Sequence, residues 1–127
     1  MRVENRAMCH AKRHFEAKNF TVEDVSRTRG HNGYDLVLRR HGRVTMVEVK
    51  GCSRAWGIPD LYSTEFDGRK RLVADFLCVV YLIGRRKPVI CLIPRKAIPP
   101  KYVEPKRGYR INSRFKKQEV LERYVQE

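Results

Sequence analysis

The apolar residues near the start of the chain follow a helical period. Residues 3–18 carry an apolar side chain at every fourth position, and their basic side chains lie elsewhere on the helical wheel. This spacing predicts an amphipathic helix. A short strand is expected over residues 20–26. Residues 27–33, which include two glycines, two arginines and His31, are expected to form a loop.

The next part of the chain holds segments of apolar residues, several of them β-branched, with charged residues at their ends. Two such segments, residues 35–40 and 43–50, are separated by a His-Gly pair, and we interpret them as a β-hairpin with a two-residue turn. This turn places Asp35 directly opposite Glu48. Because side chains alternate along a strand, Lys50 lies on the same face as Glu48, two positions further on.

The rest of the chain consists of apolar runs separated by segments that contain glycine and proline. They predict, in chain order, a loop over residues 53–62, a helix from residue 63 or 64 to residue 75, strands over residues 77–83 and 88–93, a basic irregular segment over residues 97–111 and a helix over residues 113–125. The resulting order is αβββαββ with a C-terminal helix. It requires parallel and antiparallel neighbours, so we expect an α/β fold with a mixed central sheet of about five strands flanked by helices.

The composition adds a strong positive charge to this picture. The 127 residues include 28 Lys and Arg against 14 Asp and Glu, which gives a formal net charge of +14. The length fits one domain, and an apolar content of 42% is ordinary for a globular protein. Nucleic acid is favoured over membrane as the polyanionic partner, because no helix opposes a Trp/Leu face to a Lys/Arg face. A basic protein whose charge serves solubility alone remains the alternative.

The cysteines favour an intracellular protein. All four are widely spaced, without a Cys-x-x-Cys pair, so we expect reduced thiols rather than a zinc site or a disulfide set, with Cys78 and Cys91 in the core. We identify no secretory leader, and the longest apolar run, residues 76–83, is too short to cross a bilayer. A cytoplasmic location follows as a prediction.

The opposed acids of the hairpin predict a metal site. Two carboxylates about 5 Å apart across a strand pair repel each other, and a folded protein rarely keeps such a pair without a cation. Carboxylate oxygens are hard ligands that suit Mg²⁺, with Mn²⁺ as a substitute. We expect Asp35 and Glu48 to hold the ion together with the backbone carbonyl of Val49. Lys50 would orient a water or offset charge on a phosphate, although a solvated lysine at a strand end is the commoner case.

A further acid lies on the first predicted helix. At 100° per residue, Glu4 falls within the apolar stripe of that helix, between Ala11 and Phe15. It is therefore a candidate fourth member of the site, contacting the metal directly or through a water. The alternative is an acid that simply benefits from the dipole at a helix N-terminus.

Together these residues resemble a known enzyme superfamily. An Asp, then Glu-Val-Lys-Gly at residues 48–51 at the end of an apolar strand, preceded by a helix that carries Glu4, is similar to the PD-(D/E)XK nucleases. The arrangement is most similar to archaeal Holliday-junction resolvases and related small nucleases. The resemblance implies a restriction-endonuclease-like fold and Mg²⁺-dependent cleavage of DNA. It matches Glu4, Asp35, Glu48 and Lys50 to catalytic positions.

The resemblance covers roughly residues 1–95, which we interpret as the nuclease core. Residues 96–127 form a basic C-terminal extension of the same domain, and we find no counterpart for them in that family. Tyr34 replaces the Pro of the motif. The loop over residues 29–33 lacks the serine that resolvases of this group usually carry, which leaves the form of the DNA substrate open.

Basic residues outside the motif are candidates for contacts with DNA phosphates, which give affinity without sequence preference. The candidates are Arg27, Arg29, His31, Arg69, Lys70, Arg71, Lys106, Arg107, Arg110, Arg114 and Lys117. Aromatic residues lie among those of the C-terminal segment, and Trp56 follows the motif, where it either packs on a base or sugar or anchors its loop. A solvated helix face and linker is the alternative for the C-terminal cluster, and a solvent-exposed loop histidine is the alternative for His31.

The sequence thus predicts a small metal-dependent endodeoxyribonuclease. One site of this type cuts one strand, so cutting two strands in one binding event needs a symmetric dimer, which the resemblance leads us to expect. Two alternatives remain open. The first is a non-catalytic nucleic-acid-binding module on the same fold. The second is a small basic RNA-associated or structural protein, in which Asp35 and Glu48 are unrelated surface charges.

Overall fold

The computed structural model describes residues 2–27, 33–61, 65–105, 109–111, 115 and 117–126, and every structural statement below concerns these residues. A long first helix, α1, spans Val3–Ala17, within one residue of the prediction. Its apolar stripe buries Ala7, Ala11 and Phe15, as the four-residue spacing requires. Asn19 follows with a left-handed backbone (φ of 68°), which an Asn tolerates, and the chain turns into the sheet.

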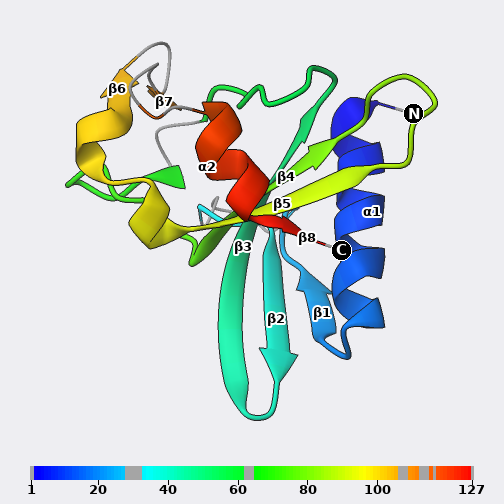
Figure 1. Cartoon of the computed structure of the whole chain (residues 1–127). Helices are drawn as coiled ribbons and strands as arrows, with labels where there is room; N and C mark the ends of the chain where they lie inside the picture. The colour runs from blue at the N-terminus through cyan, green and yellow to red at the C-terminus, as the bar shows by residue number, and fades with distance from the viewer. Residues whose placement is uncertain are drawn as a thin grey trace.

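A six-stranded mixed sheet forms the centre of the fold, which confirms the predicted α/β class (Figure 1). Its spatial order is β1-β2-β3-β4-β5-β8. The strands are β1 (Thr21–Asp24), β2 (Leu36–Arg40), β3 (Arg43–Cys52), β4 (Phe76–Tyr81), β5 (Val89–Pro94) and β8 (Val125–Gln126). Only β3 and β4 pair in parallel, and the other neighbours are antiparallel.

The two faces of this sheet bury different clusters. Val47 and Val49 of β3 pack with α1, together with Cys78 and Val80 of β4. The alternate residues of β4, among them Val79, belong to a second cluster that includes residues of the C-terminal segment. In Figure 1, α1 and α2 (Lys117–Arg123) accordingly lie on opposite sides of the sheet.

The crossover between β3 and β4 contradicts the sequence prediction. A helix was expected up to residue 75, but the described residues 65–75 contain no α-helix. The carboxylate of Asp67 instead accepts the N–H groups of Arg69 and Arg71 at 2.8 and 3.0 Å, and Phe66 bridges to Leu72. An Asp side chain that bonds to nearby backbone amides competes with the helical hydrogen bonds, and Gly68 lowers the helical propensity further. The crossover is therefore irregular.

The C-terminal segment is more ordered than predicted. The basic irregular segment contains two 3₁₀ turns, η2 (Arg95–Ala97) and η3 (Pro100–Tyr102), and a two-stranded sheet of β6 (Val103–Pro105) and β7 (Tyr109–Ile111). The last helix is shorter than expected among the described residues, and its end continues into the unpredicted strand β8, which pairs with β5. Leu121 of α2 is fully buried in the second cluster.

The cysteines are free thiols, as predicted. Cys52, Cys78 and Cys91 are buried and Cys9 is exposed. Burial raises the pKa of Cys78 to about 12 and that of Cys91 to about 11, which suits inert core thiols. Within the described part of the chain, no helix is both long and apolar enough to span a membrane.

Candidate active site

The β2–β3 hairpin positions the acids. Its ladder runs from Leu36 opposite Val47 to Arg40 opposite Arg43, which is the register that the two-residue turn predicts. His41 has a left-handed backbone, with a φ of 52°, and Gly42 one of 74°, as a type I′ turn requires. The turn therefore determines which residues of the two strands face each other.

Asp35 lies immediately before β2, whose ladder ends at Leu36 opposite Val47, and it bonds to Val47 as well, so it does not form the expected ladder pair with Glu48. The N–H of Asp35 donates to the carbonyl of Val47 at 2.9 Å, and its carboxylate Oδ2 accepts the N–H of Val49 at 2.9 Å. A backbone bond and a side-chain bond to two residues of β3 hold the carboxylate against that strand. Asp35 is buried there, as is Glu48.

Glu48 and Lys50 lie on the face of β3 away from α1. Val47 and Val49 pack with the helix, so the alternation of the strand turns Glu48 and Lys50 to the other side. The side chain of Glu48 is 3% exposed and that of Lys50 is 14% exposed, and Lys50 Nζ lies 3.6 Å from Glu48 Oε1. The structure thus brings Asp35, Glu48 and Lys50 together at one place on the sheet.

A third acid, Glu65, joins this cluster and was missed by the sequence analysis. Its side chain is fully buried, and its Oε1 accepts a hydrogen bond from Lys50 Nζ at 2.8 Å, closer than the contact to Glu48. Glu65 comes from the irregular β3–β4 crossover. No periodicity or motif spacing relates it to β3, so the sequence carries no signal for its position.

Because the three acids and one lysine lie close together in the interior, the pKa values of Glu48 and Lys50 are shifted. Burial, followed by the negative charges of Asp35 and Glu65, raises the pKa of Glu48 to about 10, against the opposing effect of Lys50. Burial by itself would lower the pKa of Lys50, but the charge and hydrogen bond of Glu65, and the charge of Glu48, raise it overall. The Oε2 atoms of Glu48 and Glu65 are buried without a hydrogen-bond partner. Such orphaned acceptors are rare in folded proteins, and each one needs a physical explanation.

The backbone of β3 adds a further oxygen. Met46 and Cys52 direct their carbonyls toward the β4 side, where these accept the N–H groups of Asp75 and Leu82. N–H and C=O groups alternate between the edges of a strand, so the carbonyl of Val49 points to the β2 side, the edge on which Asp35 binds the Val49 N–H. The described residues contain no cluster of three or more His, Cys, Asp or Glu side chains arranged to hold a metal ion. The candidate ligand set is therefore two carboxylates and this carbonyl.

Comparison with known proteins places the chain in a family. Residues 3–93 match the family model described as the C-terminal region of Protein NO VEIN. The chain belongs to this family. No curated protein matches the chain, and no solved structure matches it. The NO VEIN C-terminal match includes α1, β1 to β4 and most of β5, and so it contains Asp35, Glu48, Lys50 and Glu65.

Glu4, at the start of the NO VEIN C-terminal match, stays a predicted member of the site. It is exposed in the first turn of α1, before the buried stripe of Ala7, Ala11 and Phe15, which packs on the opposite face of the sheet from Glu48. The structure records no hydrogen bond or ion pair between Glu4 and any other described residue. The first turn nevertheless lies against the end of β3, where a Cβ added to Gly51 would come within 2.8 Å of Val3 Cγ1.

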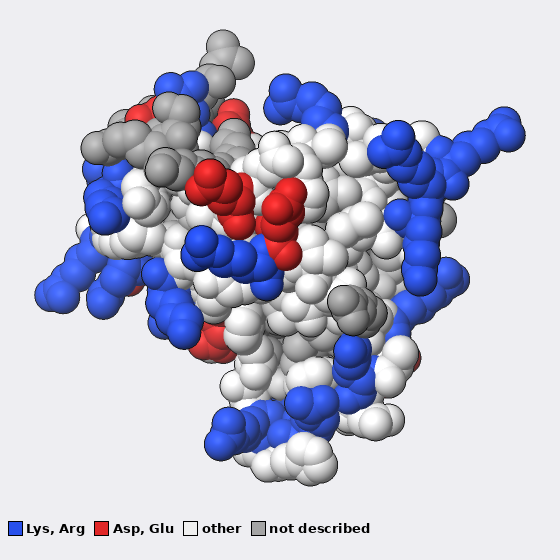
Figure 2. Space-filling model, in the orientation of Figure 1, with Lys and Arg blue, Asp and Glu red and all other residues white. Residues whose placement is uncertain are grey.

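The basic candidates are scattered over the surface. Arg27, Arg69, Lys70, Arg71 and Arg110 are exposed. Arg71 pairs with Asp67 at 3.2 Å, and Arg110 forms an ion pair with Glu104. Outside the described residues lie Arg29, His31, Lys106, Arg107 and Arg114, together with the side chain of Lys117. Figure 2 shows Lys and Arg side chains over the tip of the β2–β3 hairpin and along the margins of this face.

The aromatic candidates contribute to the core instead of forming an exposed stacking surface. Trp56 packs edge-to-face on Tyr81 with ring centroids 5.8 Å apart, so it anchors its loop. Tyr102 packs in the same way on the buried Phe115, also at 5.8 Å, and Tyr109 packs on a phenylalanine of the crossover. Packing in this core leaves little ring surface for nucleic-acid bases.

Proposed function

We propose that this protein is a metal-dependent endonuclease that hydrolyses phosphodiester bonds of DNA, with a PD-(D/E)XK type of site. The observation that carries the proposal is the buried cluster of Asp35, Glu48 and Lys50, in which a carboxylate oxygen of Glu48 has no partner. A buried carboxylate oxygen without a hydrogen-bond partner is costly, and such sites persist chiefly where function requires them.

The donor atoms fit a hard divalent cation. Asp35 and Glu48 supply carboxylate oxygens, and the carbonyl of Val49 faces the edge of β3 that Asp35 occupies. Oxygen ligands of this type, completed by waters, suit Mg²⁺ or Mn²⁺ better than softer metals. When bound, such an ion polarises a phosphoryl oxygen and lowers the pKa of a coordinated water.

The chain's own groups have separate roles in this reaction. Asp35 is oriented by the amide of Val49, so its carboxylate keeps a fixed direction. Lys50 remains an ammonium, because the surrounding carboxylates raise its pKa. It can therefore donate hydrogen bonds to an attacking water or to a phosphate oxygen on which charge builds in the transition state.

Glu65 positions this lysine. Its 2.8 Å bond to Lys50 Nζ holds the ammonium on the face of the sheet that carries Glu48. A lysine side chain has several rotatable bonds, so a buried partner reduces the entropy that must be lost when Lys50 aligns with a substrate. Glu65 does not need to touch the substrate for this effect.

A non-catalytic nucleic-acid-binding module is the competing function. It would bind DNA equally well in the presence of a chelator and after the substitution Glu48→Gln. The buried acids argue against it, because a protein that only binds phosphates gains nothing from carboxylates beside them. The fully buried Glu65 adds a further negative charge that such a module would have to neutralise.

The proposal is tested with a cleavage panel. Linear duplexes, nicked and flapped DNAs and four-way junctions are incubated with Mg²⁺ and with chelator, using the wild type, Asp35→Asn and Glu48→Gln. The exposed Glu119 on α2 provides a matched control, Glu119→Gln. We expect cleavage by the wild type and the control in Mg²⁺ alone, and a loss of at least a hundredfold in the two site variants. A wild type that cuts no DNA, or site variants that cut equally well, would contradict the proposal.

Two-strand cleavage would add a requirement for two sites. A single cluster of this kind acts on one strand, so a protein that cuts both strands in one encounter must act as a symmetric dimer. Sedimentation of the active protein at the assay concentration tests this point. Double-strand products from a strictly monomeric protein would contradict it.

A further inference from the structure

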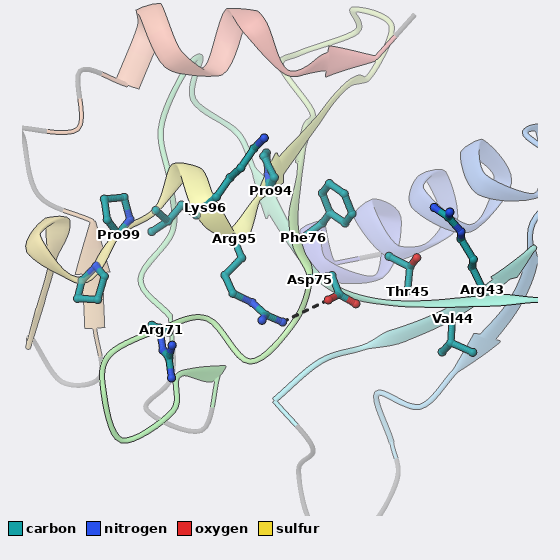
Figure 3. A pocket seen from close by; sticks show the side chains of 12 residues that line it. Arg43, Val44, Thr45, Arg71, Asp75, Phe76, Pro94, Arg95, Lys96 and Pro99 are labelled. Carbon is teal, nitrogen blue, oxygen red and sulfur yellow. Dashed lines mark hydrogen bonds and ion pairs between the residues drawn. The ribbon is translucent and has the colours of Figure 1, made fainter.

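A second charged feature lies at the open end of β3. A surface pocket of about 810 Å³ is lined by four basic residues, Arg43, Arg71, Arg95 and Lys96, and by one acid, Asp75 (Figure 3). It contains none of the residues of the acid cluster. Its basic lining on a folded protein indicates a site for an anion.

The topology of the sheet creates this pocket. The pairing of β3 with β4 begins at Val47, so Arg43, Val44 and Thr45 extend beyond the start of β4. The space beside them is closed on the other side by the end of β5, by η2 and by the Pro99-Pro100 pair. Prolines have a fixed φ, which makes this wall rigid.

Hydrogen bonds fix part of the basic lining. Arg95 donates to the carbonyls of Val73 and Ala74 at 2.9 and 3.1 Å and to Asp75 Oδ1 at 3.3 Å. The other oxygen of Asp75 accepts the N–H of Met46 at 2.8 Å. The guanidinium of Arg95 is thus held in place while 43% of its side chain remains exposed to the pocket.

Of the remaining cations, Arg71 is paired with Asp67, which does not line the pocket. Arg43 and Lys96 are exposed, and the structure records no ion pair for either with another described residue. In Figure 3, the Arg95 side chain extends toward Asp75, whereas Arg43 projects from β3 on the same side as Thr45 and opposite Val44, which is the side that faces α1. Four basic residues against one acid leave a net positive charge around the pocket.

We infer that this pocket binds a backbone phosphate of the nucleic acid whose phosphodiester bonds the acid cluster hydrolyses, an inference that rests on the proposed function. Val44 of the pocket and Glu48 of the cluster lie four residues apart on one face of β3. At about 3.3 Å per residue this is roughly 13 Å. One strand of a duplex rises about 3.4 Å per nucleotide, so the pocket lies roughly four nucleotides from the cleavage site. Contacts at this distance hold the backbone in register without reading its sequence.

Binding in the absence of metal tests the inference separately from catalysis. The double variant Arg71→Gln/Lys96→Gln removes two pocket charges, and Arg85→Gln/Lys87→Gln removes the same charges from the exposed β4–β5 loop. Fluorescence anisotropy with a labelled duplex in chelator gives Kd at several salt concentrations, and thermal melts confirm that both variants fold. We expect at least a tenfold weaker Kd for the pocket variant. The slope of log Kd plotted against log salt concentration should fall by one to two in the pocket variant and change little in the control.

The outcomes of this test are distinct. Equal weakening in the two variants, or a wild type that binds an acidic polypeptide and not DNA, would overturn the pocket as a phosphate site. A wild type that binds through the pocket but never cleaves would overturn the nuclease proposal and leave this inference standing. Cleavage by a protein whose pocket variant binds DNA normally would overturn this inference and leave the nuclease proposal standing.

Discussion

The substitution Glu48→Gln should make the metal-free protein more stable at neutral pH. Glutamine keeps the shape of the side chain but cannot ionise. Burial, followed by the negative charges of Asp35 and Glu65, raises the pKa of Glu48 in the folded protein to about 10, from an ordinary value of 4.5. The folded protein therefore holds a proton that the unfolded chain has released at pH 7.

The size of the effect follows from linkage. Stability is lost as the pH rises from 4.5 toward 10, because the unfolded state binds fewer protons than the folded state over this range. At pH 7 the unfolded glutamate is about 2.5 pH units above its pKa, which corresponds to about 3 kcal/mol at 1.36 kcal/mol per unit. Loss of the 3.6 Å contact with Lys50 offsets part of this gain. We expect Glu48→Gln to raise the free energy of unfolding by about 2 kcal/mol at pH 7.

Urea denaturation in chelator at pH 5.5, 7 and 8.5 measures the effect, with Glu119→Gln as the exposed control. The advantage of Glu48→Gln over wild type should widen as the pH rises, and the control should follow wild type. Added Mg²⁺ should then stabilise the wild type and not the variant, because a ligand that binds only the folded state raises its stability. A Glu48→Gln protein that is less stable than wild type by the same amount at every pH would refute the reasoning.

Three further predictions concern neighbouring features. Gly51→Ala should lower the free energy of unfolding by about 1–3 kcal/mol in thermal or urea melts, because its Cβ would meet Val3 at 2.8 Å. Glu65→Gln should lower the single-turnover cleavage rate by at least tenfold while Kd for DNA in chelator stays unchanged; a change in Kd alone would argue against positioning of Lys50. In a thiol-labelling assay, Cys9 should react within the mixing time, and the three buried cysteines only on unfolding; fast labelling of more than one thiol would contradict the structure.

The hairpin was predictable because it is specified locally. Its alternation has a period of two, and a His-Gly turn of two residues allows only one register, so the pairing of β2 with β3 follows from the sequence alone. The first helix was predictable for a similar reason, since three residues at four-residue spacing make up its buried stripe.

The face of the sheet that α1 covers follows from the same alternation. The apolar stripe of α1 must pack on the apolar face of β3, which carries Val47 and Val49. The acids of β3 alternate with these valines and so point to the other face. The parity of the strand therefore places the buried stripe of α1 on the face opposite Glu48.

The crossover could not be predicted from periodicity. The residues after Glu65 carry helix-compatible side chains, but the carboxylate of Asp67 bonds to local backbone amides and closes a turn instead. Glu65 reaches Lys50 only through this irregular path. Strand β8 was missed because its two residues are too few to show an alternating pattern. Its pairing with β5 depends on the packing of α2.

The central claim is that Asp35 and Glu48 together bind one divalent cation, and Mn²⁺ binding followed by electron paramagnetic resonance tests it most directly. Titration of the free Mn²⁺ signal should reveal one site per chain in the wild type and in Glu119→Gln. The site should be lost in Asp35→Asn and in Glu48→Gln. A wild type that leaves Mn²⁺ free at millimolar concentration, or variants that bind it as tightly as wild type, would contradict the claim.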